Sequence, residues 1–193
     1  MLEYILTNPW FWAFLAAVGW CLGLGVIGSH KIGRYLSIGI VMFILAEIPR
    51  LLLPLPFVNQ PRFEPTSGWA IGFGGFLFLA SLIFGTPVFR IAPITYPDRH
   101  NPLRTDGLYA IIRHPLMLCD IFWPLGWSLL FGSILGIILT PFWCLIIYIL
   151  TYVEEEALVR EYGEAYREYQ ARVPHIIPRL TLKLRRCIDG RKN

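Results

Sequence analysis

The chain has 193 residues, of which 55% are hydrophobic, 15% aromatic and only 16% charged. Soluble domains carry roughly 25% charged residues, and a soluble fold of this size cannot bury so much apolar surface. Disorder is excluded by the same composition, because disordered segments combine low hydrophobicity with high charge. The composition therefore predicts a membrane protein, in which membrane topology explains the net charge of +4 without nucleic-acid binding.

Five apolar segments approach the length of about 20 residues that a membrane-spanning helix needs. The fourth is the shortest, and only Gly132-Ser133 separates it from the fifth, which predicts a tight helical hairpin. The third contains a glycine cluster (Gly72, Gly74, Gly75) suited to close helix packing. We predict one all-α integral-membrane domain over residues 1–193, with spans at about 9–27, 35–53, 68–88, 116–131 and 134–153.

Charge gives the orientation of these five spans. The connections 30–34 and 90–113, together with everything after residue 153, share one side and hold 15 of the 17 Lys and Arg residues. Arg62 alone lies in the opposite loops, and Arg50 lies within or near the end of the second span. Because cytoplasmic loops are enriched in Lys and Arg, we expect the N-terminus outside and the C-terminus in the cytoplasm.

Glu47 and Arg50 are three residues apart and share one helix face, so they can pair within the bilayer. Intramembrane ionisable residues are candidates for function. The structural alternative is that Arg50 reaches the outer interface with Glu47 as its partner. We favour that alternative, because the pair lies toward the side away from a cytosolic cofactor.

Two cytosolic segments, 95–115 and 154–180, hold most of the remaining polar residues. In the first, Arg113 and His114 precede Pro115, where a membrane helix is expected to begin. Free backbone N–H groups and the positive end of the helix dipole favour an anionic ligand at such a point. The alternative is that Arg113 anchors the membrane interface and His114 is solvated.

The second segment opens with three carboxylates, Glu154 to Glu156, directly after an apolar run. Beyond them, apolar and aromatic residues recur at helical spacing up to Val173, which predicts an amphipathic helix. The plain interpretation places this helix on the membrane surface. A more specific interpretation places these carboxylates over Arg113 and His114, where they would close a polar pocket. It is favoured because the acidic and the basic residues leave the membrane on the same side.

These residues resemble the isoprenylcysteine carboxyl methyltransferase superfamily, which includes phospholipid N-methyltransferases. The resemblance covers roughly residues 103–178, and the motifs that carry it are the run Asp106-Gly107-Leu108-Tyr109-Ala110-Ile111-Ile112-Arg113-His114-Pro115, the helical hairpin, Glu154-Glu155, Tyr162-Gly163, Tyr166, Tyr169 and Val173-Pro174. Two departures concern the pocket: Met117 and Cys119 replace a usual tyrosine and glycine. Where prenylcysteine enzymes carry a substrate arginine, this chain has Tyr148 and Tyr152.

The resemblance implies S-adenosylmethionine as methyl donor, bound between the loop, the hairpin and the C-terminal helix, with no metal. The cofactor offers a carboxylate for a cation and an ammonium and hydroxyls for carboxylates. Its implied contacts are Leu103, Tyr109, His114, Pro115, Leu116, Met117, Glu154 and Glu155.

The predicted function is methyl transfer to a lipid-like or membrane-embedded acceptor at the cytosolic face. Arg113 and Asp120 are the predicted catalytic residues: Arg113 would orient an anionic group, and Asp120, His100 or Glu155 would act as a base if one is needed. One alternative is a membrane sterol-type reductase that uses NADPH. Another is a non-enzymatic transporter or assembly protein, which would shift attention to Glu47 and Arg50. Membrane lipids are the other expected partners.

Overall fold

The computed structural model describes residues 1–28, 45–64, 68–91 and 103–177. Within these ranges the regular structure is all helical, as predicted, and one isolated bridge joins Arg62 and Ser133. Residues 45–52 are helical. The other elements are α1 (Leu2–Thr7), α2 (Pro9–Gly28), α4 (Gly68–Ile91), the 3-10 helix η1 (Gly107–Ala110), α5 (Pro115–Leu130), α6 (Ile134–Tyr162) and α7 (Glu164–Arg172).

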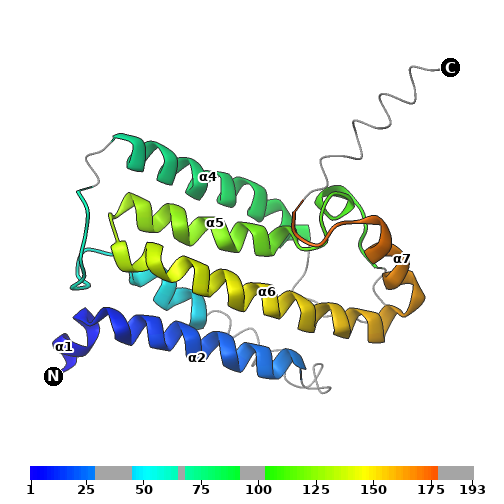
Figure 1. Cartoon of the computed structure of the whole chain (residues 1–193), viewed down its shortest axis with the longest axis horizontal. Coiled ribbons are helices and arrows are strands. Elements are labelled where there is room, and N and C mark those ends of the chain that lie inside the picture. The colour runs from blue at the N-terminus through cyan, green and yellow to red at the C-terminus, as the bar shows by residue number, and fades with distance from the viewer. Residues whose placement is uncertain (29–44, 65–67, 92–102, 178–193) are drawn as a thin grey trace.

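The long helices lie side by side in the order α4, α5, α6 and α2 (Figure 1). The helical residues 45–52 pack against α2 and α6 at Ala46 and contact α5 through Arg50. At one end of the bundle, α7 and η1 form a separate group next to the start of α5 and the end of α6 (Figure 1). The described parts of the two expected cytosolic segments, residues 103–115 and 154–177, therefore meet at one end of the molecule.

Two glycines allow α4 and α5 to approach closely. A Cβ atom at Gly126 would lie 2.6 Å from the Phe78 backbone N and 2.7 Å from the Gly74 carbonyl oxygen. A Cβ atom at Gly74 would lie 2.8 Å from Leu129 Cβ, whereas one at Gly72 meets nothing within 4 Å. The predicted packing role of the glycine cluster therefore applies to Gly74 and not to Gly72.

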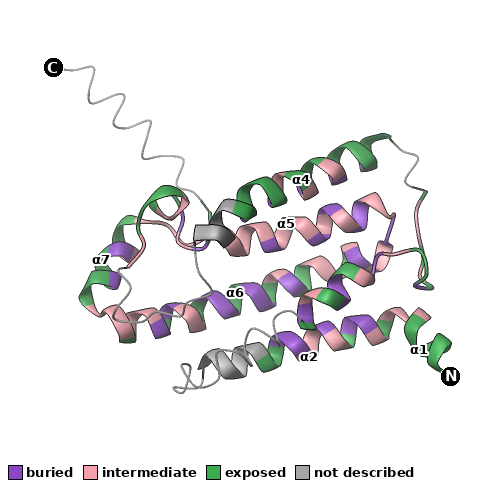
Figure 2. Ribbon diagram, turned by 180° about the vertical axis from the view of Figure 1, so that it is seen from behind, coloured by how far each residue is buried: buried purple, intermediate pink, exposed green. Residues whose placement is uncertain are grey.

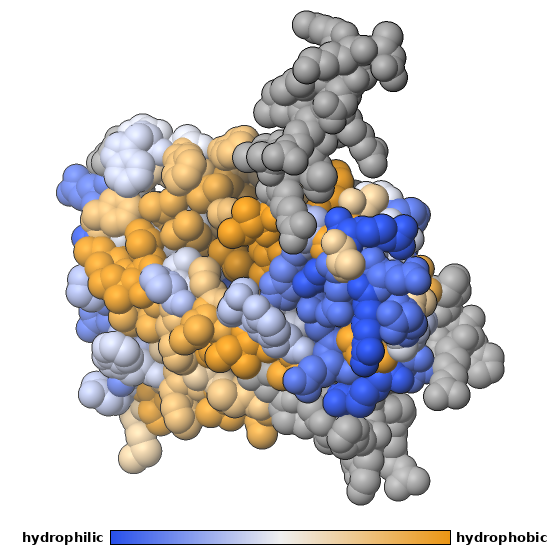
Figure 3. All heavy atoms as spheres, turned by 45° about the vertical axis from the view of Figure 1, so that its right-hand side comes forward, coloured by the Kyte–Doolittle hydropathy of each residue, from blue (hydrophilic) through white to orange (hydrophobic). Residues whose placement is uncertain are grey.

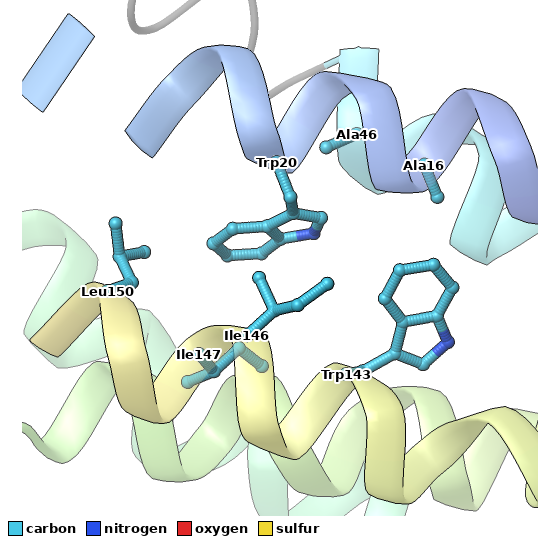
Figure 4. Packing of buried hydrophobic residues seen from close by; sticks show 7 residues of the cluster. All are labelled: Ala16, Trp20, Ala46, Trp143, Ile146, Ile147 and Leu150. Atoms are coloured by element: carbon cyan, nitrogen blue, oxygen red, sulfur yellow. The ribbon is translucent and has the colours of Figure 1, made fainter. Parts of the chain in front are cut away.

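A second packed region joins α2, residues 45–52 and α6. Its buried members are Ala16, Trp20, Ala46, Trp143, Ile146, Ile147 and Leu150 (Figure 4). Trp20 extends from α2 toward α6 and lies over Ile146 (Figure 4). Small residues bring the backbones together here too, since a Cβ atom at Gly19 would lie 2.8 Å from Ala46 Cβ.

Two described helices, Gly68–Thr86 within α4 and Ile134–Tyr162, are long and apolar enough to cross a membrane. Pro9–Leu22, the part of α2 whose side chains are described, and Pro115–Leu130 are apolar but shorter, and most of the second expected span lies outside the described residues. The outer face of α4 is largely exposed (Figure 2), with Phe76 at 65% and Ile83 at 67%. On the face shown in Figure 3, hydrophobic surface predominates over the middle of the bundle and the largest hydrophilic area lies at the α7 end.

The end of the last long helix differs from the expected one. We predicted a span ending at residue 153 followed by a separate amphipathic helix, but α6 continues to Tyr162. Gly163 has φ +58°, a conformation that glycine adopts at little cost, and it separates α6 from α7. Glu154 and Glu155 therefore lie within a continuous helix, which fixes their direction relative to the bundle.

The opposite end of the bundle is tied by Arg62. Its Nη1 donates to the carbonyl oxygens of Pro54 at 2.7 Å and Phe131 at 2.9 Å. Only residues 131–133 connect α5 to α6, and Ser133 Oγ caps α6 by accepting from the Gly136 N–H at 3.1 Å. Arg62, the basic residue that the charge pattern placed in the loops opposite the expected cytosolic side, thus stabilises the α5–α6 connection.

Candidate active site

The candidate site begins where α5 begins. Asp106 and Gly107, with φ +59° at the glycine, turn the chain into η1, and Pro115 then occupies the first turn of α5. Proline is suited to this position because the first N–H groups of a helix have no partner within it. Arg113 and His114, the two residues before Pro115, therefore lie directly at the start of α5, at the polar end of the bundle.

Arg113 joins three parts of the chain. Its Nε donates to Glu155 Oε1 at 2.6 Å, and its Nη2 donates to Glu155 Oε2 at 3.2 Å. Its Nη1 donates to the carbonyl oxygens of Gln170 at 2.9 Å and Val173 at 2.8 Å. Such a two-point contact between guanidinium and carboxylate is both strong and directional. Arg113 therefore fixes the end of α7 against α6.

The backbone at Arg113 and His114 differs from the expected anion site. The Arg113 N–H donates to the carbonyl oxygens of Pro174 and His175 at 2.9 and 3.1 Å, and the His114 N–H donates to His175 at 3.2 Å. Both groups are thus bonded by the segment after α7, which returns to the start of α5. An anionic ligand here would be recognised by side chains rather than by these two N–H groups.

His114 is buried between two carboxylates. Its Nε2 lies 3.0 Å from Glu155 Oε1 and its Nδ1 lies 3.4 Å from Glu154 Oε2. Burial lowers the pKa of His114, but the hydrogen bonds and negative charges of Glu154 and Glu155 outweigh that effect and raise it to about 9. The imidazole is therefore positively charged at neutral pH.

The two adjacent carboxylates have different surroundings. The Glu155 side chain is 8% exposed and bonded to Arg113, His114 and, at 2.9 Å, to Gln170 Nε2. The Glu154 side chain is 41% exposed. Glu155 is therefore the buried partner that joins these side chains, while the Glu154 carboxylate is partly exposed. The structure thus brings the predicted carboxylates over Arg113 and His114.

The pair α7 and η1 closes the site from the side. Tyr169 Oη donates to the Tyr109 carbonyl oxygen at 2.7 Å, and Tyr166 is almost fully buried. Burial is the main reason that the pKa of Tyr169 is raised to about 12, so its hydroxyl keeps its proton and remains a donor. Tyr109 is thereby held by its backbone with its ring half-buried.

An aromatic group beside the charged cluster was not among the predicted site residues. The rings of Tyr148 and Tyr152 lie 5.6 and 5.1 Å from the ring of His175, and their hydroxyls are 2.7 Å apart. The His175 ring lies 4.9 Å from that of His114. Helical spacing of Tyr148, Tyr152 and Glu155 indicates a shared face of α6, but no sequence signal placed His175 there. Gln170 was missed for the same reason.

His114, Glu155 and His175 place potential metal-ligand atoms within 4.8 Å of one another. Glu155 Oε1 already accepts from Arg113 Nε and His114 Nε2. A metal ion would have to displace the guanidinium and remove the proton from a charged histidine. The arrangement therefore fits an ion-pair network better than a metal centre.

The remaining predicted residues divide into two groups. The first group is close in sequence to the Glu155 cluster and comprises the buried Pro115 and three half-buried residues, Leu103, Leu116 and Met117. Of these, Met117 packs against the core formed by α2 and α6. Asp120 lies elsewhere: it is buried and bonded to Arg50 rather than to the Glu155 cluster. The structure does not bring the two predicted catalytic residues together, and His100 lies outside the described residues.

A sequence profile described as phospholipid methyltransferase matches residues 69–165, about half of the chain, and includes Arg113, His114, Glu154 and Glu155. The chain belongs to the phospholipid methyltransferase family. The profile begins at α4, so residues 45–52 are outside this family match, as are Gln170 and His175.

Two curated proteins are similar to this family member. Protein-S-isoprenylcysteine O-methyltransferase of Schizosaccharomyces pombe is 30% identical over 114 residues, which is 56% of this chain and 48% of that protein. Methanethiol S-methyltransferase 2 of Bradyrhizobium diazoefficiens is 37% identical over 92 residues, 47% of this chain and 33% of that protein. The matched segments thus span half or less of the length of these relatives. No solved structure matches the chain.

Proposed function

We propose that this protein is an integral-membrane methyltransferase that uses S-adenosylmethionine and methylates a hydrophobic, lipid-like acceptor at the cytosolic face. The observation that carries the proposal is the Arg113–His114–Glu155 network, which joins the start of α5 to the end of α6 within the residues of the family match. Both similar proteins are named as methyltransferases.

The residues present fit this cofactor. The partly exposed carboxylate of Glu154 suits an ammonium or ribose hydroxyl, and the charged His114 suits a carboxylate. Leu103, Tyr109, Leu116 and Met117 supply half-buried apolar surface nearby. When bound, the cofactor supplies an electrophilic methyl group on its sulfonium.

The residues of this chain act mainly by holding the reactants. Methyl transfer depends on alignment of donor and nucleophile and on exclusion of water. Arg113 is a positioning residue in this proposal, because its four side-chain hydrogen bonds go to Glu155, to Gln170 near the end of α7 and to Val173 directly after it. Pro115 supports it by starting α5 directly after His114.

The names of the two relatives indicate which class of acceptor to consider. One is named for O-methylation of protein-S-isoprenylcysteine, which carries a large apolar group, and the other for S-methylation of methanethiol, a small apolar thiol. Both names are consistent with a hydrophobic acceptor, and in this proposal the acceptor of the present chain reaches the site from the membrane. Large exposed apolar side chains on α6, among them Leu145 and Ile149, support approach from lipid.

We further propose the membrane arrangement of five spans in one domain, with the last two as a hairpin, the N-terminus outside and the C-terminus cytoplasmic. The segments 95–115 and 154–180 are then the cytosolic cofactor-binding elements. Two observations support it: two described helices are long and apolar enough to cross a membrane, and on the face shown in Figure 3 hydrophilic surface gathers at the α7 end, next to an apolar bundle.

Ligand titration of the purified protein in detergent tests the cofactor. S-adenosylhomocysteine is expected to raise the melting temperature saturably, because a ligand that binds only the folded state stabilises it. NADPH at the same concentrations is the control and is expected to have no effect. Stabilisation by NADPH alone would favour the reductase, and stabilisation by neither would favour a non-enzymatic membrane protein.

A further inference from the structure

Two tyrosines of α6 lie where its exposed apolar surface meets the candidate active site. Exposed apolar side chains recur along α6 at helical spacing and form one stripe: Ile138, Phe142, Leu145 and Ile149. Tyr148 and Tyr152 continue this stripe and are 45% and 49% exposed. The buried Glu155 follows Tyr152 by less than one helical turn. The exposed stripe of α6 therefore ends beside the charged network.

His175 connects the two tyrosines to that network. Its ring centroid lies 5.6 Å from that of Tyr148, 5.1 Å from that of Tyr152 and 4.9 Å from that of His114. Its Nε2 atom lies 3.6 Å from Glu155 Oε1. Tyr148, Tyr152 and His175 form an aromatic group that borders the Arg113–His114–Glu155 network directly, with no other helix between them.

The hydroxyls of the two tyrosines bind each other. Tyr148 Oη and Tyr152 Oη are 2.7 Å apart, and the two rings meet edge to face with centroids 5.0 Å apart. Because one hydroxyl donates to the other, part of their hydrogen-bonding capacity is satisfied within the pair. Contact with a hydrocarbon chain therefore costs less free energy than it would for two phenols without partners.

A role in membrane anchoring alone does not account for this arrangement. Tyrosines are enriched at membrane–water interfaces, where the ring lies in the apolar layer and the hydroxyl faces water. Here each hydroxyl is bonded to the other tyrosine, and both rings contact a histidine that contacts His114. Such a surface suits a ligand with one end at the charged network and the other end in the bilayer.

We propose that the aromatic group is the acceptor subsite of this enzyme, so that the apolar chain of the acceptor lies against Tyr148 and Tyr152 and its reactive end passes His175. This inference rests on the proposed methyltransferase function. It assigns the entry of the acceptor from the bilayer to the outer face of α6 and not to α4. The two tyrosines bind the chain and take no part in forming or breaking bonds.

A cofactor analogue with a long alkyl chain tests this route for any reacting atom of the acceptor. A nucleophile attacks the methyl carbon from the side opposite the sulfur, so an octyl group in place of the methyl of S-adenosylmethionine extends along the path of the acceptor. In detergent, the wild-type protein should bind the octyl analogue at least tenfold more tightly than S-adenosylmethionine. Burial of about two methylene groups is sufficient for this gain.

The double variant Tyr148→Ala/Tyr152→Ala removes both rings and should lose this gain, while its S-adenosylhomocysteine affinity stays within twofold of wild type. Tyr148→Phe/Tyr152→Phe keeps the rings and should keep the gain. The matched control is Phe142→Ala, which removes an exposed ring of the same stripe. Phe142 is six residues before Tyr148, about 9 Å along the helix axis, so the control should also keep the gain.

The outcomes separate this inference from the proposed function. If S-adenosylhomocysteine binds but the octyl group adds no affinity, or adds the same affinity in the double alanine variant, the acceptor subsite is wrong and the methyltransferase function stands. An equal loss of affinity for S-adenosylhomocysteine and for the octyl analogue would place the rings against the cofactor and would also overturn the inference. Absence of S-adenosylhomocysteine binding would contradict the proposed function, and the inference with it.

The wild-type protein supplies a test that does not require the double variant to fold. An octyl analogue that carries a diazirine in its chain, irradiated on the protein, should label peptides that cover residues 145–152 or His175. Excess S-adenosylhomocysteine should prevent this labelling. Labelling that is confined to α4 or α2 and is prevented by S-adenosylhomocysteine would overturn the proposed route.

Discussion

The side chains of Arg113 and Glu155, 42 residues apart in the sequence, are joined by two hydrogen bonds, Nε to Oε1 at 2.6 Å and Nη2 to Oε2 at 3.2 Å. This contact links the start of α5 to the end of α6. The same guanidinium bonds the carbonyl oxygens of Gln170 and Val173. One ion pair therefore determines how α7 closes over the site.

Replacing Glu155 by glutamine should weaken both the fold and the cofactor site. Removing one member of a buried ion pair typically costs about 3 kcal/mol or more, since Arg113 and His114 would lose their common counter-charge. We expect a lower melting temperature and at least a tenfold loss of S-adenosylhomocysteine affinity. Glu156→Gln is the matched control, because Glu156 lies 3.9 Å from Arg160 with its side chain 76% exposed. Equal affinities in the two variants would remove Glu155 from the site.

His114 should make stability depend on pH. Its folded pKa of about 9 is above the ordinary 6.5, so the folded state holds a proton that the unfolded state releases between these values. This contribution, roughly 3 kcal/mol, is complete below pH 6.5 and is lost as the pH rises through 9. Melting temperature measured from pH 6 to 10 should fall accordingly, and His114→Gln should flatten that decline. An identical decline in the variant would assign it to other groups.

Chelation should leave cofactor binding unchanged. Although His114, Glu155 and His175 lie within 4.8 Å, Arg113 Nε shares the Glu155 oxygen that a metal ion would need. We expect the same S-adenosylhomocysteine affinity before and after dialysis against EDTA. Adding zinc after dialysis should not change that affinity. A loss of affinity on dialysis that zinc restores would establish a metal centre instead.

Two glycines provide a matched test of helix packing. Gly126→Ala should destabilise the protein by about 1–3 kcal/mol, since the new Cβ would lie 2.6 Å from the Phe78 backbone N and 2.7 Å from the Gly74 carbonyl oxygen. Gly72→Ala meets open space and should be neutral or stabilising by up to about 1 kcal/mol. Melting temperatures of the two variants in detergent compare them directly, and equal shifts would contradict the close approach of α4 and α5.

The helices could largely be predicted from the sequence because apolar run length and proline or glycine boundaries are local properties. The start of α5 at Pro115 and the connection at residues 131–133 follow from such signals. The predicted span ends at residue 153, whereas the helix α6 continues for nine more residues, because the change from apolar to charged residues at Glu154 marks a change of surroundings and not the end of the helix. Gly163 ends it.

The candidate site could be predicted only in part. Arg113, His114 and Glu155 carry a motif, and their proximity follows from opposite charges on one side of the bundle. Gln170 and His175 carry no such signal, since their place depends on how the chain returns after α7. The partner of Asp120 was missed for a similar reason: Arg50 is 70 residues away, and nothing local shows that residues 45–52 face α5.

Hydrogen–deuterium exchange of the wild-type protein, with and without saturating S-adenosylhomocysteine, tests the central claim most directly. The account predicts slower exchange in peptides covering residues 103–117 and 154–176, which the ligand would hold together, and unchanged exchange in α1 and residues 53–64. Protection confined to peptides outside these two segments, or no saturable change at all, would contradict the assignment of the Arg113–His114–Glu155 network as the cofactor site.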